Sequence, residues 1–170
     1  MLFRSGGDRR DSWERGPHVK EEEFARAVAL GLFDYLRKSR ARGAVVSASG
    51  GVDSSAVACL VALAIRFAAS ESTPGAVAAR LGRDDLERLL PADRDAALRT
   101  LVGGMLTCVY QSTANSGSVT RSAARGVAES LGATFHEFDV EPLVRGYERL
   151  VAAAVGRPLA WARDDVALQN

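Results

Sequence analysis

Two adjacent glycines, placed between a short β-branched segment and a long apolar one, constrain the fold more than any other feature of this sequence. Ala44-Val45-Val46 is too brief for a helix and predicts a strand. The run Ser49-Gly50-Gly51-Val52-Asp53-Ser54-Ser55 follows it. The next segment, to about Ala69, is apolar nearly all round and predicts a helix that is buried on more than one side. A strand that turns through glycines into a buried helix is typical of an α/β fold.

The rest of the chain repeats this alternation of strand and helix. The expected elements are a helix over 19–40, strands over 44–46, 105–110 and 134–138, and, after each strand, a helix that ends near 69, 131 and 155. Strands separated by helices imply parallel pairing with right-handed crossovers. We therefore expect a doubly wound parallel sheet with flanking helices.

The length of 170 residues predicts one domain, since domains average about 150 residues. Residues 1–18 carry glycines and mixed charge without periodicity, which predicts a flexible lead-in before a domain over 19–170. Residues 70–100 hold two prolines and two glycines between short apolar pieces. Five arginines and five acids occur between residues 80 and 99, and such balanced charge is typical of a solvated face. We expect a helical insertion on the surface there.

Composition excludes several classes of function. The net charge is +1, so no basic excess favours nucleic acid or an anionic membrane as a partner. The longest apolar run, 56–65, is shorter than the about 20 residues that cross a bilayer, and the N-terminus lacks the apolar core of a signal peptide. Cys59 and Cys108 lie in apolar runs without the spacing of a metal or redox pair. We expect a cytoplasmic protein whose two cysteines are buried in the core.

The glycine pair lies where an open parallel sheet binds its ligands, at the carboxyl end of a strand. Glycines let the backbone approach a ligand closely, and the start of the next helix directs unpaired N–H groups at one point, which favours an anion. Hydroxyls of Ser47, Ser49, Ser54 and Ser55 surround that point. The segment therefore predicts a phosphate site. The alternative is a glycine turn with a Ser/Asp helix cap and no ligand.

Elimination narrows the kind of phosphate site. A Walker loop needs a lysine, and none follows Lys38, while the dinucleotide fingerprint needs glycines that are not adjacent. A carboxylate such as Asp53 repels a polyphosphate unless a cation lies between them, and Mg²⁺ prefers carboxylate and phosphate oxygens. The expected ligand is Mg-ATP or Mg-pyrophosphate.

The motif S-G-G-x-D-S at a strand-to-helix junction resembles the pyrophosphate loop of the ATP pyrophosphatase (PP-loop) superfamily. Three further segments are similar to the NAD synthetase family, and most similar to the synthetase domain of its glutamine-dependent form: Gly31-Leu32-Phe33-Asp34-Tyr35-Leu36, residues 107–116, and residues 164–170. The resemblance covers 19–170 and implies an adenine nucleotide α-hydrolase-like fold. Gln169-Asn170 resembles the start of the family's Asn-Ile-Gln-Ala-Arg segment, so we expect a domain truncated at its C-terminal end.

The resemblance implies ATP-dependent amidation of deamido-NAD to NAD. In the family, the nicotinate carboxylate attacks the α-phosphate of ATP and releases pyrophosphate, and ammonia then displaces AMP from the adenylate. Carried over, Ser49 and Asp53 become the catalytic residues, Asp53 ligates Mg²⁺, and Asp165 and Asn170 bind deamido-NAD. The implied ATP-binding residues are Ser47, Ala48, Ser49, Gly50, Gly51, Val52, Asp53, Ser54, Ser55, Tyr110, Gln111 and Ser112.

The family's partners follow from the same resemblance, and other interpretations remain open. Neither cysteine fits the family's glutaminase constellation, so ammonia would come from solution or from a glutaminase domain or subunit; a homodimer is also implied. Alternatives are another PP-loop ligase such as GMP synthetase, a tRNA-thiolating enzyme, or an inactive nucleotide-binding fragment.

Several other polar and aromatic residues allow two interpretations. His136 favours a structural role over that of a general base. Asn115, Ser116 and Ser118 favour helix capping over substrate contact. Trp13 and Trp161 favour packing over stacking on a base. We therefore expect structural, capping and packing roles for these residues.

Overall fold

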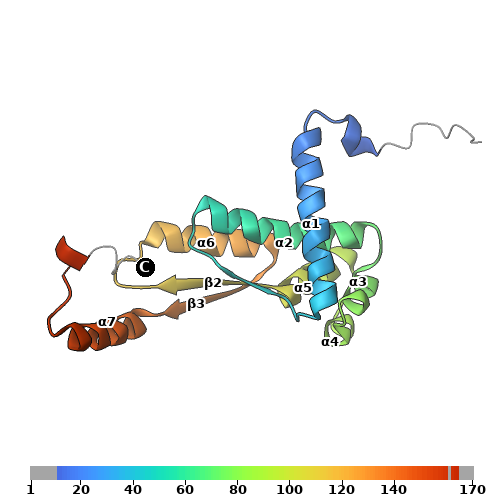
Figure 1. Cartoon of the computed structure of the whole chain (residues 1–170). Coiled ribbons are helices and arrows are strands. Elements are labelled where there is room, and N and C mark those ends of the chain that lie inside the picture. Colours follow the sequence, from blue (N-terminus) through green and yellow to red (C-terminus); the bar gives the residue numbers. More distant parts are fainter. Residues whose placement is uncertain (1–10, 161, 165–170) are drawn as a thin grey trace, which may run out of the picture.

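The computed structural model describes residues 11–160 and 162–164. Its elements are η1 (Ser12–Arg15), α1 (Val19–Ser39), β1 (Ala44–Ser47), α2 (Val52–Ser70), α3 (Pro74–Arg80), α4 (Asp84–Glu87), α5 (Arg94–Met105), β2 (Leu106–Ser112), α6 (Ser118–Leu131), β3 (Thr134–Asp139) and α7 (Glu141–Val155) (Figure 1). The expected strands and helices are confirmed to within two residues at most ends. β2 starts at Leu106 because Met105 still belongs to α5.

Part of the predicted lead-in is ordered into η1. The amide of Asp11 donates to the Glu14 carboxylate at 2.5 Å, which closes this single turn of 3-10 helix. The guanidinium of Arg26 on α1 lies 4.9 Å from the centre of the Trp13 ring and 4.7 Å from that of Phe67 on α2. Trp13 therefore packs against the domain, as the sequence predicts, and residues 12–15 are not a free extension.

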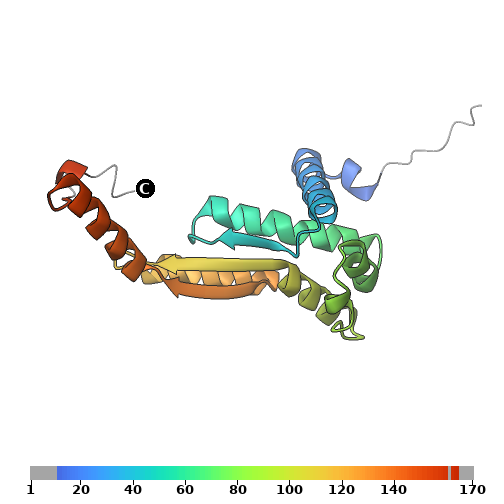
Figure 2. The same ribbon diagram turned by 60° about the horizontal axis from the view of Figure 1, so that its bottom comes forward.

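The three strands form a parallel sheet in the order β1-β2-β3. Strands added in sequence order with right-handed crossovers carry both connecting helices over the same face. Figures 1 and 2 show α2 and α6 together on that face, with α6 behind β2 and β3 in the second view. An α/β parallel sheet with flanking helices is thus confirmed. The described residues supply one of the two helical layers of a doubly wound sheet, and Val45 (73% exposed) and Phe138 (51%) lie on the other face.

The core lies between the sheet and helices α2 and α6. Alanines make up much of its helical side and let the helices approach the strands closely; its members include Ala58, Val61, Ala62, Ile65, Leu106, Cys108, Tyr110, Ala124 and Ala128. Cys108 is buried as expected, and burial raises the pKa of its thiol. Cys59 is half-buried on α2, and neither cysteine forms a disulfide.

Helix α2 is the central helix of the domain. Its 19 residues are long and apolar enough to cross a membrane by length and composition alone, because the apolar pattern continues beyond the ten-residue run in its middle. In this structure α2 packs against α1, α3, α5, α6, β1 and β2. Core helices of α/β domains pass the same test, so its composition is explained by its place in the fold.

The segment 70–100 is helical as predicted but is not confined to the surface. Val77 and Ala78 of α3, Leu81 directly after α3, and Leu86 of α4 are all buried in the core. The charge count misled the interpretation because these apolar side chains recur at helical spacing among the charged ones. This segment therefore covers the amino-terminal end of β2 with packed side chains.

Arg83 is the clearest exception to the expected solvated face. The residue is 7% exposed, and its guanidinium donates to the backbone carbonyls of Arg42 and of Gly104, the latter at 2.8 Å. The same group forms a two-bond ion pair with Asp85 at 2.9 Å, which holds the pKa of that carboxyl well below its usual range. Arg83 thereby ties the turn before β1 to the last turn of α5.

Candidate functional site

The loop between β1 and α2 needs glycine at its centre. Gly50 adopts φ +79°, and a Cβ placed there would collide with the backbone carbonyl of Thr120 on α6. Gly51 is extended at the N-cap of α2. The loop therefore passes directly against the start of α6, and only a residue without a side chain fits at position 50.

Hydrogen bonds within the loop hold it in shape. The Ser49 amide and hydroxyl lie 3.2 and 3.0 Å from the Ser54 hydroxyl, and the Gly51 amide donates to the Ser49 hydroxyl at 3.2 Å. The hydroxyls of Ser54 and Ser55 donate to the Gly51 carbonyl at 3.2 and 2.7 Å. The Ala48 amide donates to the Val109 carbonyl at 2.8 Å, which joins the loop to β2.

The N-terminus of α2 lacks a capping side chain. The amides of the first turn of a helix have no acceptor within the helix, so those of α2 are available to a ligand. Val52 and Asp53 in this turn are exposed to solvent. The glycine loop thus presents N–H groups and hydroxyls at one place, and a helix N-terminus with this composition favours an anion.

Asp53 is the acidic residue of that turn. None of the ion pairs within the described residues involves Asp53. Those residues also contain no group of three or more potential metal ligands. Mg²⁺ suits such a place because it takes one or two carboxylates and completes its shell with phosphate oxygens and water.

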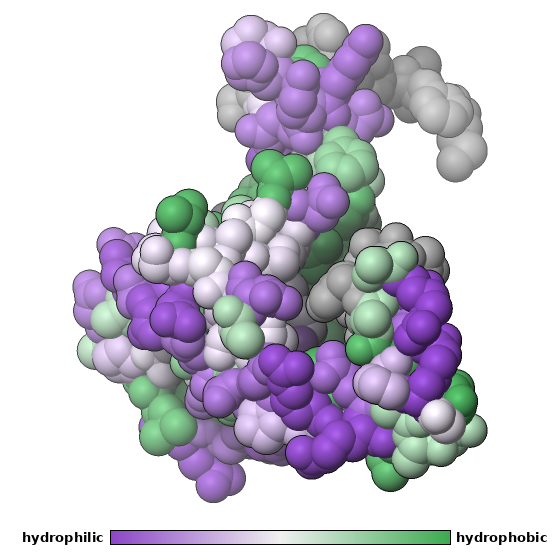
Figure 3. All heavy atoms as spheres, turned by 90° about the vertical axis from the view of Figure 1, so that its left-hand side faces the viewer, coloured by the Kyte–Doolittle hydropathy of each residue, from purple (hydrophilic) through white to green (hydrophobic). Residues whose placement is uncertain are grey.

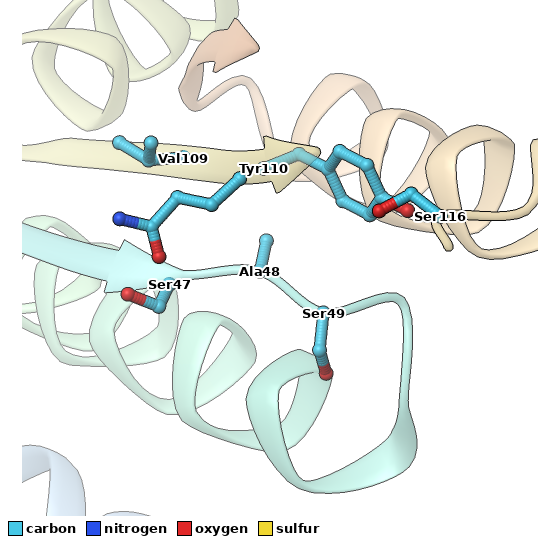
Figure 4. Close-up of a pocket in the computed structure, with 7 residues that line it drawn as sticks. Ser47, Ala48, Ser49, Val109, Tyr110 and Ser116 are labelled. Atoms are coloured by element: carbon cyan, nitrogen blue, oxygen red, sulfur yellow. The ribbon is translucent and has the colours of Figure 1, made fainter. Parts of the chain in front are cut away.

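A pocket of about 260 Å³ opens beside the loop, at the carboxyl ends of β1 and β2 (Figure 4). Ser47, Ala48 and Ser49 form one wall, and Val109, Tyr110, Gln111 and Ser116 form the other. Pockets that bind small molecules typically measure about 300–1,000 Å³, so this pocket lies just below that range. Figure 3 looks onto this end of the molecule and shows mainly pale and hydrophilic residues there.

Five of the predicted ATP-binding residues line the pocket: Ser47, Ala48, Ser49, Tyr110 and Gln111. Gly50, Gly51, Val52, Asp53, Ser54 and Ser55 form the adjoining loop and the first turn of α2. Ser112 does not line the pocket: its side chain is buried and its hydroxyl donates to the Phe138 carbonyl of β3 at 3.2 Å.

The turn over residues 113–116 contributes Ser116, which the sequence interpretation placed in a helix cap. The Ser116 hydroxyl accepts the Thr113 amide at 2.9 Å, and the Ser116 amide donates to the Thr113 carbonyl at 3.0 Å. The N-cap of α6 is Gly117, and no side chain caps this helix. Capping by Asn115, Ser116 or Ser118 is therefore wrong, and Ser116 instead faces the pocket (Figure 4).

The sequence analysis did not predict Thr120 or Val109 as residues of the site. The Tyr110 hydroxyl lies 2.9 Å from the Thr120 hydroxyl, and the Thr120 hydroxyl donates to the Gly117 carbonyl at 3.0 Å. The position of Thr120 two residues into a predicted helix, after a predicted strand, was the only signal that could have placed it at this edge. His136 is exposed on β3 and stacks on Phe138 with ring centres 5.9 Å apart; it pairs with Val109 in the sheet but does not line the pocket.

The predicted substrate residues Asp165 and Asn170, like Trp161, lie outside the described residues. The neighbouring Asp164 is described. It forms a two-bond ion pair with Arg157 at 2.9 Å and accepts the Ala160 amide at 2.9 Å. Arg157 first, and this amide second, hold the pKa of the Asp164 carboxyl well below its usual range. The pair closes the turn that follows α7.

A protein-family model described as NAD synthase matches residues 24–167, which is most of the chain. The chain belongs to the NAD synthase family. The model spans the glycine loop, the pocket and the turn that contains Ser116. The family resemblance expected from the sequence is therefore confirmed.

Individual members of the NAD synthase family show how much of the fold this chain represents. A glutamine-dependent NAD(+) synthetase from Macaca fascicularis is 29% identical over 160 residues, which cover 90% of this chain and 22% of that protein. The crystal structure of a glutamine-dependent NAD(+) synthetase from Cytophaga hutchinsonii is 40% identical with a TM-score of 0.78, over 88% of this chain and 26% of that one.

A second solved NAD synthase relative shares the fold at lower identity. This glutamine-dependent NAD+ synthetase from Acinetobacter baumannii, in complex with ADP, is 16% identical with a TM-score of 0.57, over 86% of this chain and 21% of that one. At that identity the likeness concerns the fold alone. The chain spans less than a quarter of the length of the curated relatives it matches.

Proposed function

We propose that this chain binds Mg-ATP for the amidation of deamido-NAD to NAD. The observation that supports the proposal is the loop over residues 48–55, which joins an uncapped helix N-terminus, three serine hydroxyls and an exposed carboxylate beside a pocket. Membership of the NAD synthase family adds the reaction class. The geometry suits a phosphate chain over the loop and a nucleoside in the pocket.

In this proposal the residues act by orientation and electrostatics. The adenosine lies against Tyr110 and Gln111, and the amides and hydroxyls from Ser49 to Ser55 hold the β and γ phosphates. Fixed N–H dipoles stabilise the charge that develops on the phosphates when the nicotinate carboxylate attacks the α-phosphate and pyrophosphate leaves. Asp53 would hold Mg²⁺, whose charge neutralises the polyphosphate.

The second half of the reaction consumes ammonia, which displaces AMP from the adenylated carboxylate. We propose that ammonia comes from solution or from a glutaminase domain or subunit, because both described cysteines lie on core elements rather than at the pocket. The relatives named above are glutamine-dependent.

We also propose a cytoplasmic homodimer without nucleic-acid or membrane partners. The support for an assembly is the number of large apolar side chains that remain exposed on β1, β3 and α7 of the described chain: Val45, Phe138, Leu143, Tyr147 and Leu150. Exposed apolar side chains that gather into patches are typical of surfaces that contact other proteins. Analytical ultracentrifugation of the chain tests the dimer directly, and a strictly monomeric protein at high concentration would contradict it.

Turnover tests the proposed reaction. The chain is mixed with ATP, Mg²⁺, deamido-NAD and ammonium, and the formation of AMP and NAD is followed. The proposal predicts both products, and Asp53→Ala abolishes them while the fold remains intact by circular dichroism. ATP binding without AMP release would restrict the chain to nucleotide binding. AMP release with xanthylate instead of deamido-NAD would favour a GMP synthetase.

A further inference from the structure

The turn that carries Ser116 is hydrogen-bonded to a residue that lies just after the third strand. The amide of Ala114 donates to Oε2 of Glu141 at 2.9 Å, across 27 residues of sequence. Glu141 is the first residue of α7, and only Val140 separates it from β3. The end of the third strand therefore contacts the loop after the second strand, next to the pocket.

The remaining hydrogen bonds of this turn are local. Thr113 and Ser116 bond to each other twice, and the Asn115 amide donates to the Thr113 hydroxyl at 3.3 Å. The turn continues β2 from Ser112, whose carbonyl accepts the Val140 amide at 2.9 Å. Beyond Ser112, the bond from Ala114 to Glu141 joins the turn itself to the segment that follows β3.

Glu141 is itself held in position from both sides. Its amide donates to Oδ1 of Asp139 at 3.0 Å, and its Oε1 accepts Nε of Arg145 at 2.7 Å. Arg145 also pairs with Glu148 one turn further along α7, at 3.4 Å. The Ala114 amide first, and Arg145 second, lower the pKa of Glu141, so the carboxylate is charged at neutral pH. A charged acceptor strengthens the bond to the Ala114 amide.

We infer that Glu141 is a positioning residue for the nucleoside end of the pocket, acting through Ala114 on Ser116. The inference rests on the proposed function. Ser116 lies on the same wall as Tyr110 and Gln111, whereas the loop after β1 is held by its own serines. Loss of the hydrogen bond between Ala114 and Glu141 therefore displaces the pocket wall that contacts the nucleoside and leaves the phosphate loop in place. Glu141 sets the preference for a nucleotide over a bare polyphosphate.

The test compares two ligands in variants of Glu141. Dissociation constants for Mg-ATP and for magnesium tripolyphosphate are measured by calorimetry on the whole chain. Glu141→Ala weakens Mg-ATP about 10-fold, the effect of a charged hydrogen bond, and leaves tripolyphosphate within about twofold. Glu141→Gln keeps an oxygen that accepts the Ala114 amide and restores most of the affinity. Glu148→Ala, which breaks only the outer ion pair of Arg145, is the matched control and binds both ligands normally.

Hydrogen exchange provides a second readout that does not depend on nucleotide. The Ala114 amide exchanges at least about 10-fold faster in Glu141→Ala than in the unchanged chain, and Glu141→Gln restores its protection. Equal weakening of ATP and tripolyphosphate, unchanged ATP affinity, or unchanged exchange at Ala114 would each overturn the inference. If the chain without substitutions binds neither ligand, the proposed function is overturned, and the inference with it. If that chain binds Mg-ATP and Glu141→Ala has no effect on the affinity, only the inference is overturned.

Discussion

The two ends of the sheet use their polar groups in opposite ways. At the amino end of β2, the guanidinium of Arg83 is buried and bonded to two carbonyls and a carboxylate. At the carboxyl end of β1, the first turn of α2 is uncapped and Asp53 is exposed. Polar groups that are satisfied within the protein stabilise it and leave nothing for a ligand. The comparison supports our proposal that the second region serves binding, whereas the first serves stability.

The largest effect is expected at Gly50, because its conformation matters both for the stability of the fold and for ligand binding. Gly50→Ala adds a Cβ that collides with the Thr120 carbonyl at a positive φ, so it distorts the loop. We expect a loss of about 3 kcal/mol of unfolding free energy and of at least about 100-fold in Mg-ATP affinity. Gly82→Ala is the matched control, because φ is +68° there but nothing lies within 4 Å. It costs about 1 kcal/mol and leaves binding unchanged, as urea titration and calorimetry would show.

Arg83→Ala separates stability from binding. The substitution leaves the carbonyls of Arg42 and Gly104 without their donor, and we expect a loss of about 3 kcal/mol. Mg-ATP affinity, measured at a temperature at which the variant is folded, stays within about twofold. Arg42→Ala, whose exposed side chain also pairs with Asp85, costs less than about 1 kcal/mol. A specific loss of ATP affinity in Arg83→Ala would contradict the division between the two ends.

Asp53→Asn is expected to lower ATP affinity while leaving the stability of the fold unchanged. The amide keeps the size of the side chain but removes its charge, so the Mg²⁺-dependent part of ATP affinity falls by about 30-fold. Unfolding free energy changes by less than about 0.5 kcal/mol because the side chain is exposed. Asp95→Asn is the control, since Asp95 occupies the first turn of α5 and is also exposed. Equal ATP affinity of Asp53→Asn with and without Mg²⁺ is expected, and an undiminished magnesium effect would remove Asp53 from this role.

The smallest effect is expected at the hydrogen bond between β2 and the first turn of α6. Tyr110→Phe removes the hydrogen bond between the tyrosine and Thr120 hydroxyls but keeps the buried ring. We expect a loss of about 1 kcal/mol in unfolding free energy and about a threefold loss in Mg-ATP affinity. Thr120→Ser retains the hydroxyl and serves as the control. A destabilisation like that of Gly50→Ala would mean that the hydroxyl pair, and not the close backbone contact, holds α6 against the loop.

The sequence was most informative where structure depends on neighbouring residues. The conformation of the glycine loop is determined by bonds among residues 49–55, so the motif alone indicated a phosphate site and its place at the strand end. Helix and strand positions followed from periodicity for the same reason. The helices over 70–100 were expected, but not their burial, because total charge does not reveal which side chains face inward.

Contacts between distant segments were not predictable from one sequence. Ser112 was placed at the nucleotide, but its hydroxyl bonds to Phe138 on β3. The assignment of Ser116 to a helix cap failed because its hydroxyl bonds within the turn that Glu141 holds from 27 residues away. Hydrogen bonds of this kind depend on strand register, which hydrophobic patterning does not specify residue by residue.

Calorimetric titration of the folded chain with ATP in the presence of Mg²⁺ tests the central claim most directly. Binding at one site is predicted, weakened when Mg²⁺ is removed, weakened at least about 100-fold in Gly50→Ala and retained in Gly82→Ala. Absence of binding heat at several temperatures, in a sample whose cooperative unfolding shows that it is native, would contradict the assignment of residues 48–55 as the phosphate loop.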